Sequence, residues 1–324
     1  MEQQIKGLKS PLPLAIIIAG TIIAIAMLLN SSSRQIQKTA ANSVEQKVVQ
    51  DPIILALEEV VIPSKGVTLP ISWGVMGKNL IKAGVIRGVD FQALYADRGA
   101  FTEEDERLLF GTTTGNLVIT RDNAGVLLNL FWALGLAQKN SILEKGEMMD
   151  PKYGGAGNFA STGGWTLAQG DAMAHYSYHM FFTLTSEQQA LVEKVSRGIY
   201  RPCCGNSVHF PDCNHGMAML GLLELMASQG ATEEDMWNTA LAVNSYWFPD
   251  TYVTIAMYMK NRGVEWTEAS PQEILGANYS SSLGYAKIAT QVVKPQRQLG
   301  GNGCGVDAGQ SVPVPTRQQS GCAI

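Results

Sequence analysis

The feature that most constrains this chain is a long apolar segment near its N-terminus. No charged residue occurs between Lys9 and Arg34, and the core of the segment, residues 11–29, reads PLPLAIIIAGTIIAIAMLL. At about 1.5 Å per helical residue, this core is long enough to cross the roughly 30 Å interior of a bilayer. It exceeds the apolar run of about 7 to 15 residues in a cleaved signal peptide, and no Ala-x-Ala site follows it. The sequence therefore predicts an uncleaved transmembrane anchor over residues 11–30.

The orientation of this anchor follows from the size of its two flanks. Basic residues stand on both sides of the apolar segment, so the positive-inside rule does not decide the topology. A short head followed by a large C-terminal part favours an N-terminus inside the cell. We therefore expect residues 1–10 to be a cytoplasmic head and the bulk of this single-pass membrane protein to be extracytoplasmic.

Composition sets the remaining boundaries. The formal net charge is −4 and only 16% of the residues are charged, which excludes a nucleic-acid binder driven by basic charge. Residues 31–50 are polar and typical of a stalk, whereas residues 298–324 are rich in Gly, Pro and Gln and are expected to form a flexible tail. The sequence therefore predicts one folded domain, which covers residues 51–297.

Helix signals dominate this domain. Thr102, Thr185 and Thr232 each precede acidic or amide residues, as in a helix N-cap followed by its first turn. Strand patterns are nearly absent, so the predicted fold class is mainly α with few short strands. The expected helices cover residues 73–83, 124–138, 170–184, 215–228 and 252–260, and the two expected strands cover residues 66–72 and 116–120.

The chemistry-bearing residues gather in one stretch. All four histidines of the chain fall within residues 175–215, together with three of its five cysteines. His175 and His179 are four residues apart, so on the helix predicted over residues 170–184 they share one face, and Asp171 stands one turn earlier to orient an imidazole. Taken alone, two histidines at this spacing are also typical of ordinary hydrogen-bonded side chains with no ligand. The nearby cysteines favour the metal-binding interpretation.

A loop over residues 202–216, PCCGNSVHFPDCNHG, carries the other ligand-type side chains. Its Pro and Gly residues predict a tight turn, and a helix is expected to begin at its end, where the helix dipole would lower the pKa of Cys213. Thiolate and imidazole suit copper or zinc, with iron a third choice. The predicted metal ligands are His175, His179, Cys203, Cys204, His209, Cys213 and His215.

Two alternatives stay open. An exported domain faces an oxidising environment, so Cys203 or Cys204 would bridge to Cys213 and the other to Cys304 or Cys322, in a structural or interaction protein of the cell envelope. That scheme leaves the clustered histidines and the odd number of cysteines unexplained. The second alternative is a thiol or metal redox enzyme. No catalytic residue is assigned, and the Gly-rich residues 153–165 are expected to form a mobile loop beside the site.

The same loop carries a resemblance to a known family. Tyr200-Arg-Pro-Cys-Cys-Gly, then His209, Cys213 and His215, an apolar helix and the stretch GATEEDM over residues 230–236 resemble membrane-anchored bacterial proteins with a Pro-Cys-Tyr-Cys-Gly-Cys motif. The likeness covers about 60 residues, and adjacent cysteines stand here where that family has Cys-x-Cys-x-Cys. It implies a metal binder of the cell surface whose ligands include Cys203, Cys204 and Cys213.

Taken together, the sequence predicts a membrane-anchored extracytoplasmic protein that binds a transition metal between a His-x3-His helix and a Cys-Cys-x8-Cys-x-His loop. Its expected partners are the membrane and the metal ion, with no nucleic acid.

Overall fold

The structure is a computed structural model that describes residues 52–96 and 101–292, all of which belong to one unit, Asp51–Ile324. The predicted head, anchor, stalk and tail lie outside the described residues. Within the described part of the chain, no helix is long and apolar enough to span a membrane.

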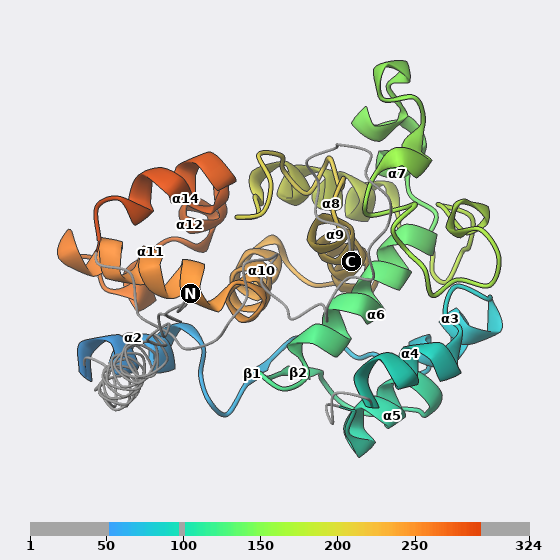
Figure 1. Ribbon diagram of the computed structural model, residues 1–324, viewed down its shortest axis with the longest axis horizontal. Coiled ribbons are helices and arrows are strands. Elements are labelled where there is room, and N and C mark those ends of the chain that lie inside the picture. Colours follow the sequence, from blue (N-terminus) through green and yellow to red (C-terminus); the bar gives the residue numbers. More distant parts are fainter. Residues whose placement is uncertain (1–51, 97–100, 293–324) are drawn as a thin grey trace, which may run out of the picture. The chain divides into compact units, whose positions relative to one another are not determined.

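The described chain is mainly helical, as predicted (Figure 1). The α-helices are α2 (Pro52–Val61), α3 (Met76–Lys82), α4 (Gly88–Ala96), α5 (Glu103–Phe110), α6 (Ala124–Ala137), α7 (Ser141–Lys145), α8 (Ser186–Gly198), α9 (Asn214–Ser228), α10 (Glu233–Trp247), α11 (Pro249–Asn261), α12 (Pro271–Leu275), α13 (Ala277–Ser280) and α14 (Ser282–Ala289). Short 3₁₀ turns are η1 (Glu147–Met149), η2 (Pro151–Tyr153), η3 (Ala156–Asn158), η4 (Ala172–Ala174) and η5 (Trp266–Glu268). Strands β1 (Val67–Thr68) and β2 (Val118–Ile119) pair antiparallel, with Val67 opposite Ile119.

The helix starts read from the sequence are confirmed. Thr102, Thr185 and Thr232 are the N-caps of α5, α8 and α10, and each forms a complete capping box with the third residue of its helix. The side-chain oxygen accepts a hydrogen bond from a backbone N–H that has no partner inside the helix, which fixes where the helix begins. The expected strands are present but only two residues long, and the helix expected from residue 73 begins at Met76.

Helices α6 and α9 form the centre of the core and lie side by side (Figure 1). Nearly every residue of both helices is buried, so neither helix has a polar face. They touch at two glycines. A Cβ atom on Gly135 would stand 2.1 Å from the carbonyl oxygen of Met217, and one on Gly221 would stand 2.4 Å from that of Phe131. This close crossing holds α9, and with it the loop that precedes α9, in one position.

The helix predicted over residues 170–184 is wrong. That segment contains only the turn η4, followed by irregular backbone. The spacing of the apolar residues and histidines favoured a helix. Hydrogen bonds to a distant part of the chain hold the segment in another conformation instead. Ser177 N and His179 N donate to the carbonyl oxygens of Leu136 and Ala137 at 2.8 Å each. These carbonyls belong to the last turn of α6, where no partner exists within the helix.

Candidate metal centre

The N-terminus of α9 positions two of the predicted ligands. Cys213 is the N-cap, and its Sγ accepts a hydrogen bond from Gly216 N at 3.4 Å. The expected helix is confirmed and begins at Asn214, so His215 stands in its first turn. Because α9 is fixed against α6, the side chains of Cys213 and His215 extend from a rigid helix end rather than from a free loop.

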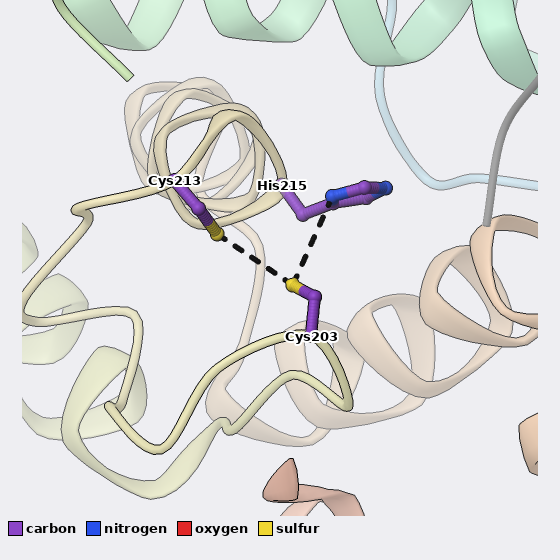
Figure 2. A group of neighbouring side chains, drawn as sticks. All are labelled: Cys203, Cys213 and His215. Atoms are coloured by element: carbon purple, nitrogen blue, oxygen red, sulfur yellow. Dashed lines mark hydrogen bonds between the residues drawn. The ribbon is translucent and has the colours of Figure 1, made fainter. Parts of the chain in front are cut away.

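Cys203 completes a compact group with these two residues, as Figure 2 shows. Its Sγ lies 3.7 Å from Cys213 Sγ and 4.0 Å from His215 Nδ1, and it lies 3.5 Å from the Sγ of the adjacent Cys204. Two zinc–sulfur bonds of about 2.3 Å at a tetrahedral angle would put the sulfurs about 3.8 Å apart, and a sulfur and an imidazole nitrogen about 3.6 Å apart. Cys203, Cys213 and His215 could therefore hold a metal ion with small adjustments, and Cys204 belongs to a second, overlapping group with Asp212 and Cys213.

Arg201 is a functional residue that the sequence analysis did not assign. Its side chain is fully buried, and Nη2 lies 3.4 Å from Cys213 Sγ and 2.8 Å from Asp212 Oδ1. Burial alone would lower the pKa of Arg201, but the negative charge that Cys213 and its neighbours carry when ionised raises it. A permanent cation is thus placed beside the thiols, where it stabilises their ionised form.

The three thiols differ in acidity. Hydrogen bonds from Cys203 and Cys204 hold the pKa of Cys213 well below its usual range, and Arg201 adds to this effect against the opposing effect of burial. The pKa of Cys203 is raised, because its thiol bonds to Cys204 and Cys213 and is largely buried. Cys213 is therefore the first thiolate of the group. The direction predicted from the helix dipole is confirmed, although side-chain hydrogen bonds contribute most of the shift.

His215 is a buried imidazole with weak hydrogen bonding. It is 0% exposed, its ring lies against Phe248 at 4.5 Å between centroids, and Nε2 has no hydrogen-bond partner among the described residues. Its ligand nitrogen lies near the sulfurs of Cys203 and Cys213, with Nδ1 4.0 Å from Cys203 Sγ. A buried polar group with only weak partners costs about 1–3 kcal/mol. A metal ion bound to Nδ1 would give this nitrogen a strong partner.

Asp212 is a second residue that the sequence analysis missed. One of its carboxylate oxygens lies within 4.8 Å of the sulfurs of Cys204 and Cys213, so it is a further donor at the edge of the cluster. Burial raises its pKa, while Arg201 opposes this shift. Arg201 directly precedes Pro202-Cys203, and Asp212 stands between Pro211 and Cys213. A charged pair inside a Cys-rich loop of a chain with few charges was the signal that could have identified them.

His175 and His179 do lie together, but not as predicted. Their rings stack with 5.2 Å between centroids, and His175 Nδ1 lies 2.9 Å from His179 Nε2. Neither belongs to the cluster of donors around Cys203. Asp171 does not orient an imidazole, because its carboxylate caps η4 through Met173 N. Burial lowers the pKa of His179, and the neighbouring His175 lowers it further.

His209 is separate from both groups. Its ring is buried, Nδ1 lies 3.9 Å from a carboxylate oxygen of Glu147, and the cluster of donors does not include it. Burial lowers its pKa, and so does the positive charge of Arg197. The seven predicted ligands are thus divided among three places. The Cys-rich loop holds Cys203, Cys213 and His215 together with the neighbouring Cys204, the histidine pair holds two, and His209 lies apart from both.

The Gly-rich residues 153–165 pack beside the Cys-rich loop. Tyr153 and Phe159 pack against Phe210, with ring centroids 5.4 Å apart in each case, and Ser161 N donates to Asp212 O at 3.2 Å. These contacts join the segment to the Cys-rich loop. The segment contributes η2 and η3 rather than an open loop.

The three described cysteines are free thiols. The separations of 3.5 and 3.7 Å from Cys203 to Cys204 and Cys213 are far longer than a disulfide bond of about 2.05 Å. The alternative bridges to Cys304 and Cys322 involve residues outside the described ranges.

Comparison of the chain with models of protein families, with curated proteins and with solved structures finds no match in any of the three. The resemblance to Pro-Cys-Tyr-Cys-Gly-Cys proteins therefore stays an expectation, and the function must be argued from the site itself.

Proposed function

We propose that this chain is a membrane-anchored extracytoplasmic protein that binds one transition metal ion through Cys203, Cys204, Cys213 and His215. The anchor is the apolar segment over residues 11–30, and the metal site belongs to the helical domain. The proposal assigns the protein a role in holding a metal ion and assigns it no reaction.

The observation that carries the proposal is the position of two sulfur atoms and one imidazole nitrogen around a third sulfur, Cys203 Sγ. The three distances from this atom, 3.5, 3.7 and 4.0 Å, are close to three of the six edges of a tetrahedron of zinc ligands. The donor set also matches a structural zinc site, in which three cysteines and one histidine close the coordination sphere.

The charge around the donors supports the same function. A metal ion binds thiolates and releases their protons, so a site that favours ionised sulfur binds metal more tightly at neutral pH. Cys213 already has a low pKa, and the buried cation of Arg201 stands 3.4 Å from its sulfur. Asp212 and Asn206 fix that guanidinium, because it pairs with the carboxylate and donates to Asn206 O at 3.0 Å.

Zinc is the ion that the tetrahedral spacing fits, and copper(I) is the ion that the soft thiolates also suit. The two differ in the number of ligands they use. Zinc needs all four side chains, including His215, whereas copper(I) is satisfied by fewer thiolates. Substitution of His215 therefore distinguishes them: zinc is lost with the imidazole, and copper(I) remains bound to the three cysteines.

The test is the metal content of the full chain, purified in detergent without chelator and without metal-affinity resin. We expect about one equivalent of metal per chain in the parent and close to none in Cys203→Ser. Cys322→Ser is the matched control for loss of a cysteine, and His209→Ala is the matched control for His215→Ala. Both controls should keep the metal content of the parent.

Two results would contradict the proposal. One is an equal metal content in Cys203→Ser and the parent. The other is a metal-free parent in which Cys203 or Cys204 is recovered in a disulfide with Cys213, which would favour the structural alternative.

A further inference from the structure

Two thiols of the Cys-rich loop lie close enough to react with each other. Cys203 Sγ lies 3.7 Å from Cys213 Sγ, and Figure 2 shows the two side chains pointing toward one another, one from the loop and one from the start of α9. A disulfide bond is about 2.05 Å long, so the sulfurs must approach by about 1.7 Å to form one. The same two sulfurs are therefore placed both for a shared metal ion and for a covalent bond.

Cys204 is the poorer covalent partner of Cys203, although its sulfur is nearer, at 3.5 Å. The two cysteines are adjacent in the sequence, and the Cα atoms of adjacent residues are about 3.8 Å apart. A disulfide bond usually joins residues whose Cα atoms are about 4.4–6.8 Å apart. Adjacent cysteines fall short of this range, so the bond that the loop favours is the one between Cys203 and Cys213.

The two sulfurs differ in how firmly they are held. Cys213 is 5% exposed, caps α9, and accepts a hydrogen bond from Gly216 N. Cys203 stands in a turn of the loop and is partly exposed. A Cβ atom on the nearby Gly205 would meet no atom of the described chain within 4 Å, so this side of the turn is open. We therefore expect Cys203 to move toward Cys213 when the bond forms.

The buried charge beside these thiols keeps a partner after a disulfide has formed. Arg201 Nη2 lies 3.4 Å from Cys213 Sγ and 2.8 Å from Asp212 Oδ1. A disulfide is uncharged, so its formation removes the negative sulfur from the side of the guanidinium. The carboxylate of Asp212 remains beside Arg201, and the cation is not left buried and unpaired, which would be strongly destabilising.

We propose that the site is a redox switch with two exclusive states. In the reduced state Cys203 and Cys213 bind the metal ion, and in the oxidised state they form a disulfide and the ion is released. The inference rests on the proposed function, because it concerns the same ligands. Oxidation leaves only Cys204 and His215 as donors, too few for a closed zinc site of four ligands.

The oxidant of this switch is a small organic disulfide, RSSR. The ionised sulfur of Cys203, the more exposed of the two, attacks one sulfur of the reagent, whose S–S bond breaks as RS⁻ leaves. The ionised sulfur of Cys213 then attacks the Cys203 sulfur of this mixed disulfide, and the second RS⁻ leaves.

The cysteines lose two electrons in these two steps, and the reagent gains them and becomes two thiols. The protons of these thiols come from the cysteines or, in the metal-bound form, from water. The metal ion leaves with its charge unchanged. Because thiols pair in an oxidising compartment, bound metal and the disulfide compete there for the same sulfurs.

The test uses the full chain in detergent, with Cys304 and Cys322 replaced by serine so that only the three thiols of the loop remain. The chain is reduced with a phosphine, freed of it, and then treated with oxidised glutathione. We expect the zinc-free chain to become lighter by two hydrogens and to give peptides joined through Cys203 and Cys213. The oxidised chain should bind zinc at least about tenfold more weakly than the reduced chain, and reduction should restore binding.

Cys203→Ser and Cys204→Ser are the matched variants, because each removes one of two adjacent thiols. Cys204→Ser should form the bond to Cys213 about as fast as the parent, whereas Cys203→Ser should form an internal bond at least about tenfold more slowly. Saturation with zinc should slow the oxidation of the parent by a similar factor, because a metal-bound sulfur is a poor nucleophile.

Two results overturn the switch. One is a chain that binds zinc when reduced and binds it equally well after oxidation, and the other is equal oxidation rates in Cys203→Ser and Cys204→Ser. Either result leaves the proposed function intact. A fully reduced chain that binds no zinc contradicts the proposed function itself, and the switch falls with it, so the two failures are distinguishable.

Discussion

The two histidine-bearing regions of this protein are built by opposite means. In the Cys-rich loop, Cys213 and His215 are placed by the helix that follows them in the sequence. In the segment from His175 to His179, the two rings are placed by the end of a helix that is far away in the sequence, α6. The first arrangement is local, whereas the second is tertiary, with His175 buried and His179 partly exposed. Histidine thus joins a group of thiols in one place and a hydrogen-bonded pair of imidazoles in the other.

Removal of Arg201 should produce the largest effect and should damage the Cys-rich loop alone. Arg201→Met leaves the carboxylate of Asp212 and the thiolate of Cys213 without their buried cation, which costs about 3–5 kcal/mol. We also expect metal to be lost from the cluster in the folded fraction. Chemical denaturation and metal analysis measure the two effects. Arg197→Met, at an exposed arginine on α8, is the control, and equal stability of both variants would show that the cation is unimportant.

Substitution of Ser177 should have a smaller effect that is confined to the histidine pair. A β-branched side chain fits poorly at φ 50°, and Ser177→Val also removes the hydroxyl that accepts from Asn140 N. Chemical denaturation should show a loss of about 1–3 kcal/mol in unfolding free energy, and metal analysis should show an unchanged zinc content. Ser186→Val, at an exposed position in α8, is the matched control. Loss of zinc in Ser177→Val would mean that the two regions are coupled.

The third prediction concerns Glu224, which lies on α9 behind the Cys-rich loop and is not one of the proposed metal ligands. Its side chain is 0% exposed, and burial raises its pKa well above the usual range, with a small opposing effect of Asn140. The folded state therefore keeps a proton that the unfolded state loses above about pH 4.3, so stability falls as the pH rises. The slope is on the order of 1 kcal/mol per pH unit until the folded carboxyl itself ionises.

Glu224→Gln should remove that slope, because the amide does not titrate. Denaturation of both proteins between about pH 5 and pH 8 measures it. If the parent and the variant show the same dependence on pH, then Glu224 is not the buried titrating group that we expect.

The sequence predicted the local features of this protein well. The three helix N-caps were predicted correctly. The threonine hydroxyl and the Asp or Gln at the third position of the helix bond the same two backbone N–H groups at any helix start, whatever the rest of the fold. The start of the helix behind the Cys-rich loop was also predicted correctly, and Cys203, Cys213 and His215 do lie close together, because they stand within a short stretch that ends at a helix N-terminus. These features depend on neighbours in the chain, so a single sequence is sufficient to find them.

The sequence could not predict the features that depend on distant partners. The spacing of His175 and His179 indicated one helix face, and the rings do meet, but on irregular backbone that donates hydrogen bonds to the last turn of α6. Nothing in the local pattern shows that those carbonyls need partners at that place. His209 also has partners outside the Cys-rich loop, because its backbone N–H donates to Ser196 O on α8 and its ring lies 3.9 Å from a carboxylate oxygen of Glu147.

The most direct test of the central claim is X-ray absorption at the zinc edge of the zinc-loaded full chain. The account predicts three sulfur neighbours at about 2.3 Å and one nitrogen at about 2.0–2.1 Å. A first shell of nitrogen and oxygen alone would contradict it, since the ion would then be bound away from Cys203, Cys204 and Cys213.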